Sequence, residues 1–139
     1  MVSEILDTKI NEPLRVLVVV TSMNRGGLET FTMNVYRALN RSKVQLDFLL
    51  HRSDSGAYEE EIESLGGHIY RVRRQNPLDP RYWTALNEFF AKHPYEVVWA
   101  QLDCLSAEPL AAAARHGAIV RVAHSHNSYQ DRDLKYPLK

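Results

Sequence analysis

The segment RVLVVV, Arg15–Val20, is followed at once by the polar segment TSMNRGG, Thr21–Gly27. Apolar residues occupy nearly every position of the first segment, which is typical of a central strand in a parallel sheet covered on both faces. The second segment ends in a glycine pair and predicts a loop. Apolar residues then recur at helical spacing and predict a helix with one apolar face, made of Leu28, Phe31, Val35, Ala38 and Leu39.

The same alternation continues along the chain. It predicts further strands at 44–50, 68–72, 97–100 and 118–123, and further helices at 57–65, from 80 to a point before Pro94, and at 106–115. Asp79 and Pro80 are typical of a helix start, and Gly66 and Gly117 of helix ends. Five strands alternating with four helices predict a Rossmann-like α/β fold, a parallel sheet with helices on both faces.

Ligands of such sheets bind beyond the carboxyl ends of the strands, near the point where the strand order reverses. Two polar loops are predicted at that edge, Thr21–Gly27 and His124–Ser128. A third, Gln101–Leu105, leaves the fourth strand beside them. We therefore expect the functional site among these loops.

The composition restricts the class of protein. The chain has 139 residues and a formal net charge of +0, which predicts one domain and gives no overall attraction to nucleic acid. The only cysteine, Cys104, cannot form an internal disulfide, which favours a reducing compartment. The longest apolar run, Val16–Val20, is far below the ~20 residues needed to span a bilayer. Residues 1–11 do not resemble a signal peptide.

The glycine pair lacks the common nucleotide motifs. Neither GxGxxG nor GxxxxGK[ST] is present around Gly26 and Gly27. A glycine pair before a helix allows close approach of a ligand, and the helix dipole favours an anion there. The alternative is a tight turn that requires positive φ at glycine. Glu29, in the first helical turn, suits the dipole by itself.

Two histidines, His124 and His126, follow the fifth strand. They are too few for zinc, which needs three or four ligands, and we predict no metal and no cofactor. A histidine in this place can form a hydrogen bond with a sugar hydroxyl or a developing charge. The alternative is a pair of solvated loop histidines.

A basic cluster, Arg71, Arg73 and Arg74, is opposed locally only by Asp79. Such a run is usually a solvated loop, and its functional alternative is contact with phosphate on a lipid headgroup or a phosphorylated lipid carrier. The acidic run 59–63 predicts a solvated helix face.

Several segments, in the expected order, resemble the N-terminal domain of bacterial capsular and exopolysaccharide glycosyltransferases of family 4 (group 1), which have the GT-B fold. The matching segments are Gly26–Glu29, Leu46–His51, Tyr58–Arg71 and Arg121–Ser128. The resemblance divides the chain into an N-terminal tail (1–13), a Rossmann-like acceptor-side domain (14–128) and a truncated C-terminal tail (129–139). One departure is Glu96–Gln101, where relatives often carry histidines, so a histidine contact from that strand is not expected.

The resemblance implies transfer of a sugar from a nucleotide-diphosphate donor to a lipid-linked saccharide acceptor, with retention and without metal. Gly26 and Gly27 would lie near the donor phosphates. A histidine would contact the donor sugar, with His126 ahead of His124 because it fits the family's T-x-H spacing. The predicted substrate-binding set also includes Arg25, Asn127 and Ser128. The basic cluster Arg71, Arg73 and Arg74 would be an acceptor or membrane patch.

The acidic E-x7-E motif of the family belongs to a C-terminal domain that this sequence does not contain. We therefore expect a fragment that is inactive alone, cytoplasmic or peripheral at the inner face of the plasma membrane. Its partners would be the nucleotide sugar, the acceptor and the missing GT-B domain. Two alternatives remain, a stand-alone α/β binding or regulatory module and a GT-B sugar-nucleotide epimerase.

Overall fold

The computed structural model of the chain describes residues 12–126. Two predicted substrate-binding residues, Asn127 and Ser128, lie outside the described residues, as do 1–11 of the N-terminal tail and the whole C-terminal tail.

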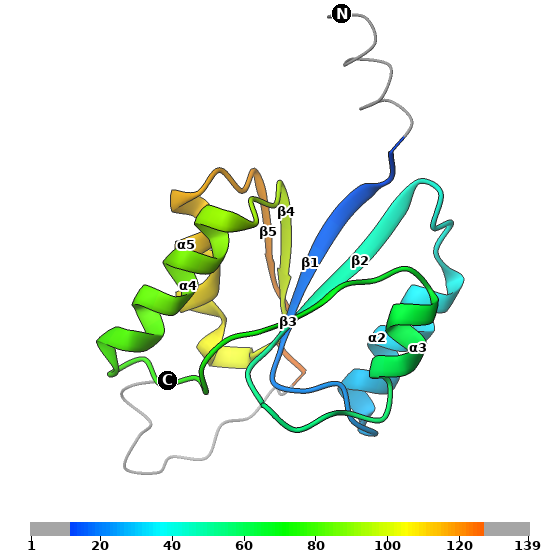
Figure 1. Ribbon diagram of the computed structural model, residues 1–139, viewed down its shortest axis with the longest axis horizontal. Helices are drawn as coiled ribbons and strands as arrows, with labels where there is room; N and C mark the ends of the chain where they lie inside the picture. Colours follow the sequence, from blue (N-terminus) through cyan, green and yellow to red (C-terminus); the bar gives the residue numbers. More distant parts are fainter. Residues whose placement is uncertain (1–11, 127–139) are drawn as a thin grey trace, which may run out of the picture.

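The centre of the fold is a parallel sheet of five strands in the order β3-β2-β1-β4-β5 (Figure 1). The strands are β1 (Leu14–Val20), β2 (Val44–Leu50), β3 (Ile69–Arg71), β4 (Val97–Ala100) and β5 (Val120–Ala123). The chain first builds outward from β1 to β3 and then returns to place β4 on the other side of β1. The order therefore reverses between β1 and β4, and the predicted Rossmann-like α/β fold is confirmed.

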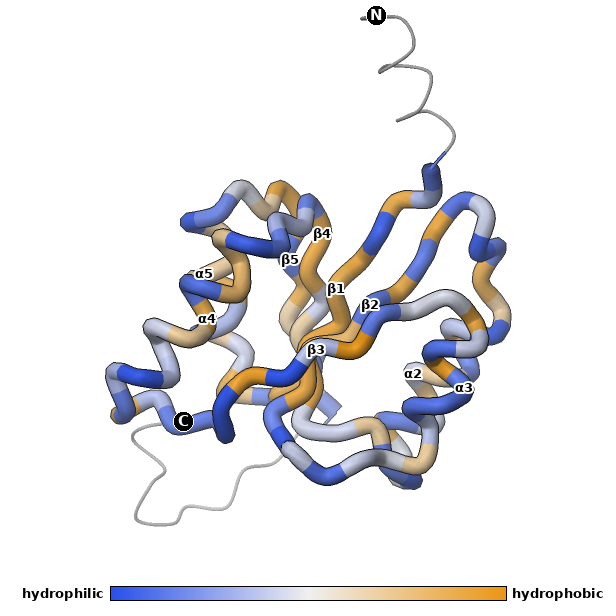
Figure 2. Tube along the Cα trace, in the orientation of Figure 1, coloured by the Kyte–Doolittle hydropathy of each residue, from blue (hydrophilic) through white to orange (hydrophobic). Residues whose placement is uncertain are grey.

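Helices cover both faces of the sheet, as predicted. One face carries α2 (Gly27–Ala38) and α3 (Glu59–Ser64), and the other carries α4 (Pro80–Lys92) and α5 (Ala107–Arg115), preceded by the short 3₁₀ helix η1 (Asp103–Ser106) (Figure 1). Hydrophobic residues gather along the central strands (Figure 2).

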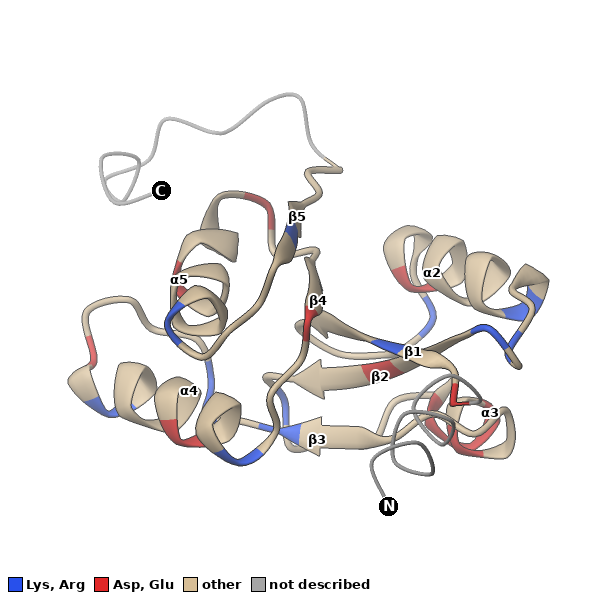
Figure 3. Ribbon diagram, turned by 90° about the horizontal axis from the view of Figure 1, so that it is seen from above, with Lys and Arg blue, Asp and Glu red and all other residues tan. Residues whose placement is uncertain are grey.

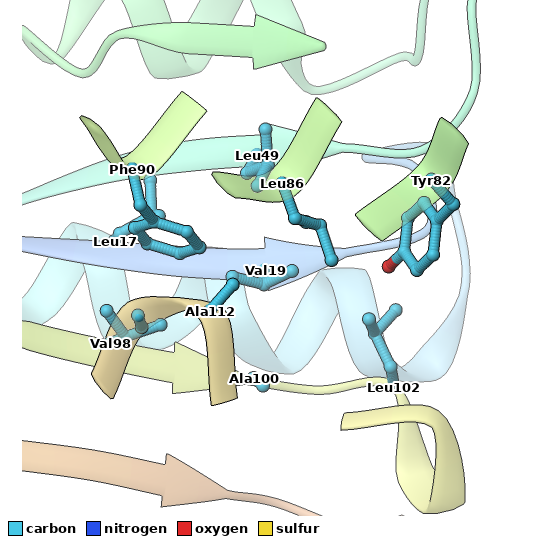
Figure 4. Packing of buried hydrophobic residues seen from close by; sticks show 11 residues of the cluster. Leu17, Val19, Leu49, Tyr82, Leu86, Phe90, Val98, Ala100, Leu102 and Ala112 are labelled. Atoms are coloured by element: carbon cyan, nitrogen blue, oxygen red, sulfur yellow. The ribbon is translucent and has the colours of Figure 1, made fainter. Parts of the chain in front are cut away.

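Two hydrophobic clusters pack the sheet against its helices. On the α4 side, Leu86 and Phe90 lie over Leu17, Val19 and Leu49 of the central strands (Figure 4). On the α2 side, the cluster includes Met33 and Tyr36 with alternate residues of the same strands. The central strands are thus apolar on both faces, which explains the nearly continuous apolar run in β1.

The predicted helix boundaries are largely confirmed. The Asp79 side chain accepts a hydrogen bond from the Arg81 N–H at 3.0 Å, and Pro80 begins α4. Gly66 and Gly117 follow α3 and α5 with φ of 93° and 94°, a backbone conformation that favours glycine. Ser106 precedes α5 but does not cap it, because its hydroxyl accepts from the Leu102 N–H at 3.1 Å instead.

The buried face of α2 is shifted by about one residue from the predicted apolar face, so that prediction is wrong in detail. The buried residues are Thr32, Met33 and Tyr36, whereas Phe31 is 44% exposed. The two polar residues can be buried because both have hydrogen-bond partners. Thr32 binds Gln101, and the Tyr36 hydroxyl donates to Gln45.

Candidate functional site

The loops after β1, β4 and β5 meet at the carboxyl edge of the sheet. Parallel pairing continues just beyond the strands, because Gln101 N–H donates to Val19 O at 2.9 Å and His124 N–H donates to Ala100 O at 2.8 Å. Gln101 therefore lies beside the end of β1, and His124 beside the end of β4. This is the switch point of the strand order, where the sequence predicted a site.

A cluster of aromatic rings joins residues 124–126, the histidine loop that follows β5, to α2. The His124 ring stacks on Trp99 with centroids 5.9 Å apart and an interplanar angle of 13°. Phe31 makes T-shaped contacts with both histidine rings, with centroids 5.7 Å from His124 and 6.0 Å from His126. The two rings lie 4.1 Å apart. Helix α2 and the histidine loop are thus brought together, although nearly 100 residues separate them in the sequence.

Gln101 connects these elements with hydrogen bonds. Its side chain is almost fully buried, and its Oε1 lies 3.1 Å from the His126 Nε2. On the other side, its Nε2 lies 3.0 Å from the Thr32 hydroxyl of α2. Sequence reasoning missed Gln101 and Thr32 as site residues. The available signal was a polar residue directly after a buried strand, between the two loops already singled out.

Asp103 fixes the histidine loop through hydrogen bonds. Its Oδ1 accepts hydrogen bonds from the His126 backbone N–H at 2.8 Å and from the Ser125 hydroxyl at 3.1 Å. Its φ of 50° lies in the left-handed region, which non-glycine residues enter infrequently and which often marks a functional site. Asp103 was also missed, because its partners lie more than 20 residues away.

The glycine pair does not form a turn with positive φ. Gly26 is the N-cap of α2 with an extended backbone, φ −160° and ψ 175°, and no side chain caps the helix. The Glu29 carboxylate lies against Gly26, whereas a side chain added at Gly27 would meet nothing within 4 Å. The tight-turn alternative is therefore wrong. The start of α2 is accessible at Gly27, whereas the Glu29 carboxylate covers Gly26.

The basic cluster is divided rather than continuous. Arg71 forms an ion pair with Glu59 at 2.5 Å, and Arg73 approaches Asp79 at 3.7 Å. Among the described residues, Arg74 forms no ion pair. The prediction that only Asp79 opposes the cluster is wrong, because Glu59 lies close to Arg71 in space though not in sequence.

The prediction of a fully solvated acidic face on α3 is also wrong. Glu59 is buried, and its Oε1 accepts from the Gly56 N–H at 2.8 Å. Glu61 is paired with Arg37 at 2.6 Å. Figure 3 shows the acidic residues gathered on α3. Glu59 and Glu61 thus connect α3 to neighbouring elements, through Arg71 and Arg37.

A pocket lies at the same edge of the sheet, on the β1–β3 side. It has a volume of about 450 Å³ and is lined by Thr21, His51, Arg52, Ser53, Asp54, Arg74 and Gln75. These residues follow β1, β2 and β3. The lining is polar and contains both signs of charge, which suits a ligand with hydroxyl or phosphate groups.

His51 forms the buried wall of this pocket. Its Nδ1 lies 2.9 Å from Val20 O, which can only accept, so Nδ1 carries the proton. Its Nε2 therefore accepts from the Tyr82 hydroxyl at 2.9 Å. Burial lowers the pKa of His51, against a smaller opposite effect of the Val20 carbonyl. A neutral His51 thus joins β2 to the first turn of α4.

Neither a metal centre nor a membrane span is found in residues 12–126. This part contains no group of three or more His, Cys, Asp or Glu side chains that could hold a metal ion. No helix within it is both long and apolar enough to cross a bilayer.

The comparisons with known proteins agree with this architecture. The family described as "Glycosyl transferase 4-like domain" matches residues 26–138. A curated Bacillus subtilis (strain 168) protein named "Putative glycosyltransferase EpsF" is 43% identical over 116 residues, which are 82% of this chain and 30% of that protein. The chain therefore spans less than a third of the length of this relative. No solved structure gives a significant match. The family match covers both the glycine pair and the histidine loop, and the chain belongs to the glycosyl transferase 4-like domain family.

Proposed function

We propose that this chain is the acceptor-side part of a retaining, metal-independent glycosyltransferase of surface polysaccharide synthesis. The enzyme would move a sugar from a nucleotide-diphosphate donor to a lipid-linked saccharide. The observation that carries the proposal is the contact of the histidine loop with α2 at the switch point, through Gln101 and Phe31. This arrangement sets a hydrogen-bonding histidine beside the open start of a helix.

The donor sugar would be bound by the histidine loop. His126 is the better candidate, because its ring is exposed and only its Nε2 has a hydrogen-bond partner among the described residues. His124 packs between Trp99 and Phe31, which suits support of the loop rather than contact with the sugar. The donor phosphates would approach Gly27 and Arg25 at the start of α2, and the Glu29 carboxylate, which lies against Gly26, would turn away when they bind.

The acceptor would enter from the β1–β3 side. The pocket at His51 and Arg74 is large enough for a sugar ring with a phosphate, and its mixed polar lining suits both. Arg71 and Arg73 precede Arg74 in the chain and would keep their ion pairs with Glu59 and Asp79. Contact with an anionic membrane, at the cytoplasmic face, would depend on this local cluster because the chain as a whole is neutral.

The rest of the enzyme would supply the nucleotide site. Since the chain spans 30% of the length of its Bacillus relative, a second GT-B domain would close over the carboxyl edge described here. We expect the 139-residue chain alone to be inactive and the donor specificity to lie largely in that second domain.

A chimera tests the proposal. This chain replaces the matching segment of the Bacillus relative, and transfer of labelled sugar from a panel of nucleotide sugars into membrane lipid extract is measured. Transfer by the chimera, and its loss in His126→Ala but not in the surface variant Glu88→Ala, would support the proposal. Release of an altered nucleotide sugar would instead indicate an epimerase. Tight binding of a ligand or protein by the isolated chain, with an inactive chimera, would indicate a binding module.

A further inference from the structure

Gln101 lies between two hydrogen-bonding partners, Thr32 of α2 and His126 of the histidine loop. It follows β4 directly, is 2% exposed, and lies between α2 and the histidine loop. Buried amides require partners for both their oxygen and their nitrogen. Gln101 has partners on both sides, Thr32 and His126, and the identity of the donors decides which atom faces which.

The hydroxyl of Thr32 fixes the direction of these hydrogen bonds. It lies within hydrogen-bond distance of Leu28 O at 2.9 Å and of the Gln101 Oε1 at 3.2 Å, and its one proton goes to Leu28 O, the nearer acceptor. The lone pairs of the hydroxyl are then available to accept, and the Gln101 Nε2 donates to them at 3.0 Å. The amide group lies with its Nε2 nearer to Thr32 and its Oε1 toward the histidine loop.

This orientation determines the proton position on His126. The Gln101 Oε1 is an acceptor without a proton and lies 3.1 Å from the His126 Nε2. The Nε2 must therefore carry the proton, which leaves the lone pair of a neutral ring on Nδ1. Asp103 holds the His126 backbone N–H at 2.8 Å, so the ring cannot easily leave this arrangement.

We propose that Gln101, oriented by Thr32, is a positioning residue that fixes His126 as the Nε2–H tautomer and presents Nδ1 as a hydrogen-bond acceptor to a substrate hydroxyl. The contact with a substrate rests on the proposed function, whereas the tautomer does not. A sugar whose hydroxyl donates to Nδ1 is accepted, and a group at the same place that can only accept a hydrogen bond is rejected.

The tautomer can be measured directly on the 139-residue chain. The chain is labelled with 15N-histidine, and long-range 15N–1H correlation spectra are recorded at pH 8.5, where an ordinary imidazole is neutral. Signals of His126 are assigned by their loss in His126→Asn. We expect the Nε2–H tautomer to predominate in the unmodified chain. Predominance of the Nδ1–H tautomer would overturn the proposal without any variant.

Substitutions then test the origin of the preference. Gln101→Met keeps the length of the side chain and removes the acceptor, so the ratio of Nδ1–H to Nε2–H should rise about fivefold, the effect of one ordinary hydrogen bond. Thr32→Val should move the ratio in the same direction, because the amide can then rotate, whereas Thr32→Ser keeps the hydroxyl and should preserve it. Gln45→Met is the matched control, since Gln45 is also buried but binds Tyr36 and Leu65.

An unchanged ratio in Gln101→Met and Thr32→Val would overturn the proposal. If Gln101→Met fails to fold, as shown by its amide spectrum, the Thr32→Val and Thr32→Ser pair decides. The outcome is independent of the transfer reaction. An inactive chimera with the expected tautomer would contradict the proposed function alone, and an active chimera with the other tautomer would contradict the role of Gln101 alone.

Discussion

Asp47, fully buried in β2, receives two hydrogen bonds from the guanidinium of Arg15 in β1, at 2.7 Å to Oδ2 and 2.6 Å to Oδ1. The Tyr95 hydroxyl donates to Oδ2 at 2.7 Å, and the His68 N–H donates to Oδ1 at 2.8 Å. One carboxylate thus joins β1, β2 and the residues before β3 and β4. It lies toward the amino ends of the strands, away from the candidate site, and its role is structural.

Arg15→Met should strongly destabilise the fold. It removes the guanidinium and leaves the buried Asp47 carboxylate with the Tyr95 hydroxyl, the His68 N–H and the partly exposed His68 ring, whose Nδ1 lies 3.1 Å away. Breaking a buried ion pair by removing one partner costs about 3 kcal/mol. Urea unfolding followed by circular dichroism measures the change. Arg52→Met is the matched control, because Arg52 and Asp54 form an ion pair in which both side chains are 58% exposed, and its loss should cost less than about 1 kcal/mol. Equal effects of the two variants would contradict this role of Asp47.

The same network predicts a dependence of stability on pH. Burial by itself raises the pKa of Asp47, but the hydrogen bonds from Arg15, His68 and Tyr95 outweigh it and hold the pKa below its usual value. Because the pKa of the folded state is the lower one, this stabilisation is present above the unfolded pKa of about 3.9 and is lost as pH falls through the folded pKa. Unfolding free energies measured from pH 5 to pH 2 should therefore decrease.

Asp47→Asn separates this contribution from those of other acids. The variant should be less stable at pH 7 and should lose less of its remaining stability between pH 4 and pH 2. Asp54→Asn, at an exposed position, should follow the unmodified chain. An acid decrease that is identical in all three proteins would show that Asp47 does not carry it.

Tyr82→Phe should destabilise the junction of β2 and α4. It removes the hydroxyl that donates to the buried Nε2 of His51, and an unsatisfied buried acceptor costs about 1–3 kcal/mol. Tyr58→Phe is the matched control, since the Tyr58 hydroxyl meets Thr30 at a partly buried position and its loss should cost less. Thermal unfolding of the two variants at equal concentration measures the difference. A smaller effect at Tyr82 than at Tyr58 would contradict the assignment of His51 as a neutral acceptor.

The strands, and the sheet edge at which the site lies, could be predicted because strand patterns are local in the sequence. Continuous apolar runs and alternation gave the exact bounds of β2 and β4. In contrast, β3 and β5 are shorter than predicted, since each pairs with a neighbour on one side only. The position of both polar loops at the carboxyl edge of the sheet followed from the general rule for parallel sheets.

The interactions that sequence reasoning missed are those between distant residues. Thr32 and Gln101 are 69 residues apart, and their mutual hydrogen bond explains why Thr32 can lie on the buried face of α2. Glu59 and Arg71 likewise form an ion pair that local charge patterns cannot reveal. The predicted roles of Gly26, Gly27, Arg25, His124 and His126 are not tested by the fold and remain predictions.

His126→Ala should lower kcat of the chimera about 100-fold, comparable to the removal of one preorganised hydrogen-bonding group from an active site. His124→Ala should have a smaller effect on kcat and a larger one on stability, because the His124 ring packs on Trp99. His116→Ala is the matched histidine control, since His116 lies at the end of α5 and contacts Asn87. Steady-state rates with saturating donor check the ranking, and a larger loss for His124 would reverse the assignment.

Arg74→Gln and Arg71→Gln should affect different properties, although the two residues are only three positions apart in the sequence. Arg74 lines the pocket and forms no ion pair with a described residue, so its loss should raise the KM for a phosphorylated acceptor about tenfold, the effect of one charge-assisted hydrogen bond. Arg71 is held by the buried Glu59, and its loss should instead lower the unfolding free energy while leaving KM nearly unchanged. Acceptor titrations of the chimera and urea unfolding of the chain distinguish the two effects. Equal changes of KM in both variants would show that the basic cluster acts as one diffuse charge, and that the pocket at Arg74 is not the acceptor site.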